Sequence, residues 1–185
     1  MKRTFLAVNV SDETRQLIVS LHQELHFSKQ YIRFVSPKTV HVTLKFLGDV
    51  KTEIIPDIIA NIESSIRSIQ KFDYICSGTG VFPNVNKPRI LWLGITKGSD
   101  ILAGISKTLN QALVNMPVKK EDREFRSHIT LGRIKETRKS LPDIDRFTKY
   151  SFDPIVNHVD QIILYESILT SQGAIHKPLH KFLLK

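Results

Sequence analysis

Two short segments of the sequence share one pattern, and this repeat constrains the fold more than any other feature. The segment from His41 to Gly48 begins His-Val-Thr-Leu, and the segment from His128 to Arg133 begins His-Ile-Thr-Leu. About half of the 185-residue chain separates the two copies. Polar and apolar residues that alternate in this way are typical of a half-buried β-strand. The repeat therefore predicts two related lobes, each containing one such strand, whose sheets face one another.

Strand alternation divides the residues of the first copy between two faces. His41 and Thr43 are expected on one face, because successive side chains in a strand point to opposite sides. The other face carries Val42, Leu44 and Phe46, which can enter an apolar core. The second copy follows the same rule. A site between the two lobes would then contain two imidazoles and two hydroxyl groups, with no carboxylate from either motif.

This set of groups suits the hydrolysis of a phosphodiester without a metal ion. One neutral imidazole can take a proton from the attacking water while a second, protonated imidazole gives a proton to the departing ribose oxygen. Histidine can do either near neutrality, because its ordinary pKa is about 6.5. We therefore predict His41 and His128 as the catalytic pair. The hydroxyls of Thr43 and Thr130 can donate hydrogen bonds to the phosphate oxygens, whose charge grows in the transition state.

A zinc site is the main alternative for the two histidines. Two imidazoles supply only half of a tetrahedral shell, and neither motif has a cysteine or a second histidine at ligand spacing. The chain has one cysteine, Cys76, so it can form no internal disulfide and no thiolate cluster. We expect no metal and no other cofactor, and we interpret Cys76 as a small core residue.

Further candidates for contacts with the substrate lie near the two motifs. Arg133 would face away from His128 by strict alternation, so it reaches the phosphate only if Gly132 permits a β-bulge or if the strand ends there. A solvent-facing arginine is the alternative. Arg126 could contact the backbone of RNA, and the aromatic rings of Phe82 and Phe125 could stack on a base. Trp92 could also stack, but its position in an apolar strand favours the core.

The rest of the chain alternates short strands and helices. The expected strands cover 5–10, 40–46, 72–75, 89–95, 128–131, 160–166 and 175–184, and the expected helices cover 11–27, 52–70, 100–114 and 141–150. Hairpin-length connections together with long helices favour an α+β fold with antiparallel sheets. The length fits one domain over residues 1–185, built of two lobes.

The composition indicates the kind of partner and compartment. The net charge of +9 favours a polyanion such as RNA. Neither a membrane-spanning run nor a signal peptide with a cleavage site is expected. The single cysteine favours a reducing compartment, so we expect a cytoplasmic protein with no membrane partner, and a monomer.

With these residues assembled, the chain resembles the two-histidine phosphoesterase superfamily, and within it the RNA 2′,3′-cyclic phosphodiesterases, historically called 2′-5′ RNA ligases. The resemblance covers nearly the whole chain, including the strand from Phe5 to Val8 and the late segment from Leu164 to Leu169. Two positions depart from the family pattern: Ser127 replaces a usual proline before the second motif, and His176 lies where many members have a tyrosine. The second departure bears on base stacking and substrate preference.

The resemblance implies a bilobal fold with pseudo-two-fold symmetry and a basic cleft between two antiparallel sheets. It implies that RNA 2′,3′-cyclic phosphate ends, including those of tRNA fragments, are hydrolysed to 2′-phosphates with the 3′ oxygen leaving. By this analogy His41 is the acid and His128 is the base, while Thr43, Thr130 and Arg133 hold the phosphate.

Two alternatives to cyclic-phosphate hydrolysis stay open. One keeps the site but changes the reaction to 2′-5′ phosphodiester cleavage or reversible 2′-5′ joining of RNA. The other is a non-catalytic RNA-binding module that uses only the basic surface.

Overall fold

The computed structural model describes residues 1–24, 31–121, 123–135, 144–171 and 173–185. Its strands are β1 (Lys2–Asn9), β2 (Ile32–Phe34), β3 (His41–Val50), β4 (Phe72–Phe82), β5 (Ile90–Ile95), β6 (His128–Ile134), β7 (Ile155–Val159), β8 (Gln161–Thr170) and β9 (Gly173–Leu183). The helices are α1 (Asp12–Glu24), α2 (Ile55–Ile66), α3 (Ser99–Ala112) and α4 (Ile144–Thr148), and a 3-10 turn, η1 (Thr52–Ile54), precedes α2.

The expected α+β fold with antiparallel strands is confirmed, and most of the expected elements are present. Two short strands, β2 and β7, were not expected from the sequence. The strand expected over 72–75 is much longer, because β4 continues to Phe82. The predicted ends of the first helix and of the 141–150 helix fall partly on residues 25–30 and 136–143, which lie outside the described part of the chain.

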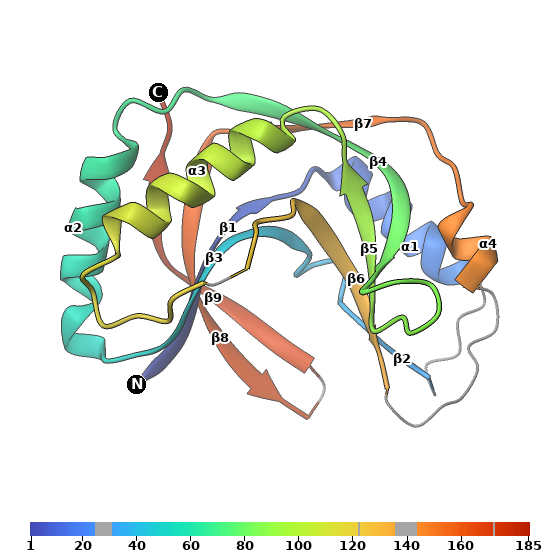
Figure 1. The fold of residues 1–185 in the computed structure, drawn as a ribbon, viewed down its shortest axis with the longest axis horizontal. Helices are drawn as coiled ribbons and strands as arrows, with labels where there is room; N and C mark the ends of the chain where they lie inside the picture. Colours follow the sequence, from blue (N-terminus) through green and yellow to red (C-terminus); the bar gives the residue numbers. More distant parts are fainter. Residues whose placement is uncertain (25–30, 122, 136–143, 172) are drawn as a thin grey trace.

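The strands form one continuous antiparallel path in the order β7-β4-β5-β6-β3-β1-β8-β9, with β2 added on β6. At the centre of this path, β3 and β6 share a single residue pair, Val42 with Ile129. On one side of this pair lies the sheet of β3, β1, β8 and β9, and on the other lies the sheet of β6, β5, β4 and β7 (Figure 1). The two predicted sheets are therefore joined where the two histidine motifs meet.

The helices are exchanged between the two lobes. Helix α3, from the second half of the chain, packs against β3 and against α2. Helix α1, from the first half, contacts β7, and α4 contacts β4 (Figure 1). One lobe thus consists of β1, β3, β8 and β9 with α2 and α3, and the other of β2 and β4 to β7 with α1 and α4. Each lobe takes segments from both halves of the sequence.

The start of α1 is fixed by a polar residue that caps it. The hydroxyl of Ser11 accepts a hydrogen bond from the backbone N–H of Thr14 over 3.2 Å. The side chain of Asn157, on β7, is fully buried beside this turn. Its Oδ1 accepts hydrogen bonds from the backbone N–H of Ser11, at 2.7 Å, and from the hydroxyl of Thr14, at 3.0 Å. Asn157 therefore ties β7 to the helix that covers it.

Replacing Asn157 by leucine is expected to lower the free energy of unfolding by about 1–3 kcal/mol. The substitution leaves the buried donors of Ser11 and Thr14 without an acceptor, and each such loss costs roughly this amount. Urea denaturation measures the change. The matched control is Asn61→Leu on α2, where the exposed amide donates to a carbonyl of its own helix and to a methionine sulfur. Equal stability of both variants would contradict the role of Asn157.

Candidate active site

The two histidine motifs lie beside each other at the centre of the strand path. Val42 and Ile129, which pair across β3 and β6, are fully buried, whereas His41, Thr43, His128 and Thr130 are all half-buried. The structure therefore separates the core residues from the polar residues of each motif in the way that alternation predicts. An antiparallel register through this pair makes His41 and His128 diagonal neighbours, which are typically about 7–8 Å apart between Cα atoms.

Each imidazole is held by a hydrogen bond to a backbone carbonyl two residues earlier in the chain. Nδ1 of His41 lies 2.8 Å from the carbonyl oxygen of Thr39, and Nδ1 of His128 lies 2.6 Å from that of Arg126. A carbonyl oxygen can only accept, so each Nδ1 carries the proton and donates it. In a neutral imidazole this leaves Nε2 as the free acceptor. Backbone carbonyls two residues upstream thus set the tautomer of both rings, a role that the motif alone does not reveal.

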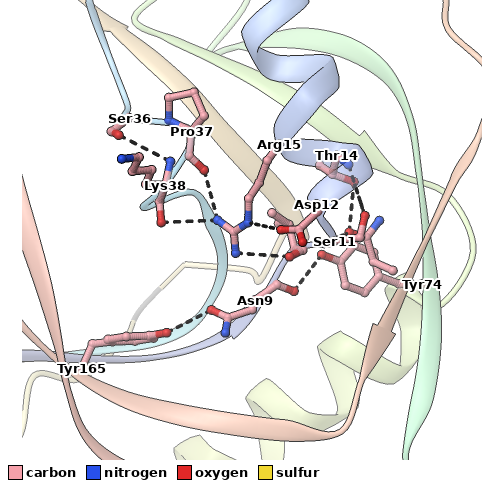
Figure 2. Close-up of polar contacts among 12 residues, drawn as sticks. Asn9, Ser11, Asp12, Thr14, Arg15, Ser36, Pro37, Lys38, Tyr74 and Tyr165 are labelled. Carbon is pink, nitrogen blue, oxygen red and sulfur yellow. Dashed lines mark hydrogen bonds and ion pairs between the residues drawn. The ribbon is translucent and has the colours of Figure 1, made fainter.

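The turn before His41 is anchored by Arg15 on α1 (Figure 2). One of its guanidinium nitrogens donates to the carbonyl oxygens of Pro37, at 3.0 Å, and Lys38, at 3.3 Å. The other donates to the carbonyl of Val10 over 3.2 Å. Because Thr39 follows directly, Arg15 helps to fix the carbonyl that orients His41.

His41 lies in a cluster of aromatic rings on the first lobe. Its ring stacks on Phe5 at 4.8 Å between centroids, and the ring of His176 meets it edge-on at 5.1 Å. Tyr165 also stacks on Phe5, at 5.3 Å, and its ring lies 6.4 Å from that of His41 between centroids. Its hydroxyl donates to the side-chain oxygen of Asn9 over 2.9 Å (Figure 2). His176, one of the two departures from the family pattern, is thus part of the surroundings of His41.

Burial lowers the pKa of both histidines. The pKa of His41 falls to about 4, chiefly because its ring is removed from water, with smaller contributions from the nearby imidazoles of His176 and His128. The pKa of His128 is also lowered, first by burial and then by the positive charge of Arg133. In the free protein both rings are therefore mainly neutral at pH 7, with Nε2 able to accept a proton.

The second motif contains a β-bulge at Gly132, one of the two ways in which Arg133 could turn towards this face. In the pairing of β5 with β6, Trp92 lies opposite Thr130 and Leu91 lies opposite Gly132. Leu131 is therefore the extra residue of β6. Arg133 is exposed, and its charge acts on His128. A Cβ atom on Gly132 would come within 2.9 Å of the side chain of Ile32 on β2, so glycine also fits the close approach of that strand.

The first motif contains the same bulge, which overturns one expectation. Ala7 pairs with Thr43 and Leu6 pairs with Lys45, so Leu44 is the extra residue of β3. Lys45 therefore turns inward, is only 5% exposed, and donates to Oδ1 of Asn110 at 2.5 Å. Phe46 was predicted to face the core, and this prediction is wrong. It is exposed, and it takes the position in the first motif that Arg133 takes in the second.

The other residues considered for contacts with RNA lie in different surroundings. Phe82 meets the ring of His128 edge-on at 5.1 Å between centroids. Arg126 is exposed and forms a loose ion pair with Glu124 at 3.8 Å. Phe125 is half-buried and packs against the core, which leaves less of its ring for an RNA base. Trp92 was expected in the core, but it is half-buried and lines a hollow beside His128.

Ser127, at the other departure from the family pattern, links the second motif to α3. Its hydroxyl shares a hydrogen bond of 2.7 Å with the hydroxyl of Ser99, the first residue of that helix. This contact helps to fix the approach to β6.

Neither a metal centre nor a membrane segment is found in the described ranges. Among their residues no group of three or more histidine, cysteine, aspartate or glutamate side chains could hold a metal ion. None of the helices there has the length and apolar character needed to cross a bilayer.

Comparison with known proteins places this fold and site in a class. A family model described as LigT like Phosphoesterase matches residues 8–92 and again residues 93–176, so each match contains one of the two motifs. The protein is therefore a phosphoesterase of the two-histidine class. Within that class, the chain belongs to the LigT-like phosphoesterase family.

Similar proteins extend over almost the full chain. It is 32% identical to the RNA 2′,3′-cyclic phosphodiesterase of Archaeoglobus fulgidus and 33% identical to that of Methanocaldococcus jannaschii; each alignment covers 97% of this chain and 99% of the relative. A crystal structure of a protein from Thermus thermophilus superposes with a TM-score of 0.80 and 26% identity, over 98% of this chain and 97% of that one. Escherichia coli LigT complexed with 3′-AMP has the same fold, with a TM-score of 0.80, 23% identity and coverage of 100% and 98%.

Proposed function

We propose that this protein hydrolyses RNA 2′,3′-cyclic phosphate ends to 2′-phosphates, by general acid–base catalysis with His41 and His128 and without a metal ion. The observation that carries the proposal is the matched pair of half-buried imidazoles, each with Nδ1 held by a backbone carbonyl and Nε2 left for the substrate. The names of the relatives from Archaeoglobus fulgidus and Methanocaldococcus jannaschii support the choice of RNA and of the cyclic phosphate. The protein would act as a monomeric single domain in the cytoplasm.

In this mechanism the two rings act on opposite sides of the phosphorus atom. His128 takes a proton from the attacking water, and His41 gives a proton to the 3′ oxygen of the ribose as that bond breaks. The phosphate then stays on the 2′ oxygen. Thr43, Thr130 and Arg133 donate hydrogen bonds to the non-bridging oxygens, where negative charge accumulates. The order of acid and base follows the family resemblance.

The low pKa of His41 in the free protein has to rise before this ring can act as an acid. A bound phosphate provides the cause, because a negative charge beside an imidazole favours its protonated form. Binding of the substrate would therefore load His41 with the proton that it later gives away.

The pH profiles provide the test. A general acid loses activity as the pH rises through its pKa, and a general base loses activity as the pH falls through its pKa. We expect a bell-shaped profile of kcat/KM with both limbs below the ordinary histidine pKa of about 6.5, since this profile reports the free enzyme. The profile of kcat should lie at higher pH, because bound phosphate raises both pKa values. Coincident profiles would contradict the loading of His41 by the substrate.

The assay uses an oligonucleotide with a 2′,3′-cyclic end, with and without EDTA. Equal rates and a 2′-phosphate product are expected. Loss of activity on chelation would indicate a metal enzyme, and a 3′-phosphate product would reverse the assignment of the leaving oxygen. A 2′-5′-linked substrate in the same assay tests the alternative reaction, and RNA binding without turnover of either substrate would favour the non-catalytic module.

A further inference from the structure

A hollow of about 460 Å³ opens beside His128, on the second lobe. Its lining comes from three places: the bulged part of β4, the end of β5, and the residues that lead into β6. Gly78 and Gly94 lie in this lining. Gly94 pairs directly with His128, and a Cβ atom there would come within 2.7 Å of the carbonyl oxygen of Ser77. Glycine at position 94 therefore permits the close approach of the bulged part of β4 to β5, beside His128.

The matching position of the first lobe carries a side chain instead of a glycine. Asn9 pairs with His41 in the way that Gly94 pairs with His128. The side chain of Asn9 is held by the hydroxyl of Tyr165, and His176 covers the ring of His41 from another side. The two lobes are thus alike in their strands but differ in the residues beside the two histidines, and the hollow lined by Trp92 adjoins His128.

Trp92 forms a flat wall of this hollow. Its ring lies across Gly80 on the neighbouring strand, where a Cβ atom would come within 2.2 Å of the indole carbon Cζ2. Phe82 contacts Trp92 at 5.1 Å between ring centroids and contacts His128 at the same distance. The Nε1–H of Trp92 is buried and has no acceptor among the residues that the structure describes. The ring is therefore positioned by packing alone, with part of its surface exposed towards the hollow.

Apart from Ile95, the other side chains of the lining are polar, and that of Arg126 is positively charged. The hollow also includes Ser77, Thr96 and Ser127, and the exposed guanidinium group of Arg126. An aromatic wall, hydroxyl groups and a cation beside a phosphate site match the chemistry of a nucleotide. Bases stack on aromatic side chains, and arginine accompanies the phosphate backbone.

We propose that this hollow binds a nucleobase of the RNA substrate, stacked on Trp92. The inference rests on the proposed function, which puts the phosphate between His41 and His128. Two bases of the RNA lie close enough to the cyclic phosphate to occupy the hollow. One belongs to the terminal nucleotide, which carries the cyclic phosphate, and the other to the nucleotide before it. The His128 side is selected for the base because the hollow there has the ring of Trp92 in its wall.

The single tryptophan of the chain makes this proposal directly measurable. Adenosine 2′-monophosphate, which is not hydrolysed further here, is expected to quench the fluorescence of Trp92 on binding, whereas inorganic phosphate is not. A diadenylate that ends in a 2′-phosphate is the second probe. Quenching by both nucleotides assigns the terminal base to the hollow, and quenching by the diadenylate alone assigns the preceding base. Binding of both, measured by calorimetry, without quenching by either would overturn the proposal.

Variants supply a second readout. Trp92→Ala should raise KM for the cyclic-phosphate substrate by about 5- to 150-fold, the range expected for the loss of one stacked base, with little change in kcat. Trp92→Phe keeps an aromatic surface and should stay close to the wild type. The matched control is Phe46→Ala, which removes an exposed ring from the first lobe. An unchanged KM in folded Trp92→Ala, or a rise only in Phe46→Ala, would contradict the assignment.

A further variant separates this proposal from the proposed function. His41→Ala should lower turnover by orders of magnitude while adenosine 2′-monophosphate still quenches Trp92. Loss of quenching with intact turnover in Trp92→Phe is the trivial result of removing the fluorophore, so KM is the readout for that variant.

Discussion

Replacing either His41 or His128 by alanine is expected to lower kcat on a cyclic-phosphate RNA end by about two to four orders of magnitude. Each ring transfers one proton in the transition state, and a positioned acid or base typically contributes this much. Both variants should fold, because each ring is only half-buried and its removal leaves the paired residues Val42 and Ile129 in place. The measurement is the single-turnover rate at saturating substrate, together with thermal unfolding.

The matched control for these two variants is His158→Ala. This histidine lies on β7, is largely exposed, and forms a contact with Asp73 at 2.5 Å. Its removal should leave the rate unchanged. Full activity in His41→Ala or His128→Ala would refute the assignment of the catalytic pair, whereas equal losses in all three variants would point to a general effect on the fold.

The second large effect is expected at Arg133. Arg133→Ala should lower kcat/KM by about 10- to 100-fold, because hydrogen bonds to a charged group contribute roughly 1.5–3 kcal/mol. Arg133→Lys keeps the charge but loses the planar fork, and it should be intermediate. Arg67→Ala is the control, since this exposed side chain follows α2 on the first lobe and is not assigned to the substrate.

The pH profile distinguishes a phosphate contact from a purely structural role of Arg133. Its positive charge lowers the pKa of His128, so its removal should raise that pKa. As a base, His128 must be deprotonated, and the limb of kcat/KM that reports it should move to higher pH in Arg133→Ala. A loss of kcat/KM with no movement of either limb would indicate that Arg133 is not beside His128 in solution.

Much of this architecture could be predicted from the repeat and from periodicity. The His-x-Thr pattern indicated the strands, the faces and the two-lobe plan, because alternation over a few residues depends only on local backbone geometry. Gly132 marked a position where a bulge before Arg133 was one of two possibilities, and the bulge is present. Phe46 was placed on the wrong face because nothing in the local pattern marks the equivalent bulge in β3, where the buried Lys45 finds Asn110 on a helix 65 residues away.

Other features depend on contacts that are distant in the sequence. The carbonyl groups of Thr39 and Arg126 could be named only from coordinates, because any residue type can supply a backbone oxygen. Trp92 lies in an apolar run that is typical of a core strand. Its half-buried position depends on Gly80, which lies opposite it on another strand. A glycine in the sequence indicates room for a neighbouring ring only when the residue opposite it in the sheet is known.

The exchange of helices between the lobes has a consequence for how this chain can be divided. A cut between residues 92 and 93 would separate the two sequence repeats, yet neither fragment would contain a whole sheet with its own covering helices. Each fragment would expose the apolar faces that the other normally covers. The two repeats should therefore behave as complementary fragments that regain structure only when mixed, so the catalytic pair depends on their association as well as on the sequence of each motif.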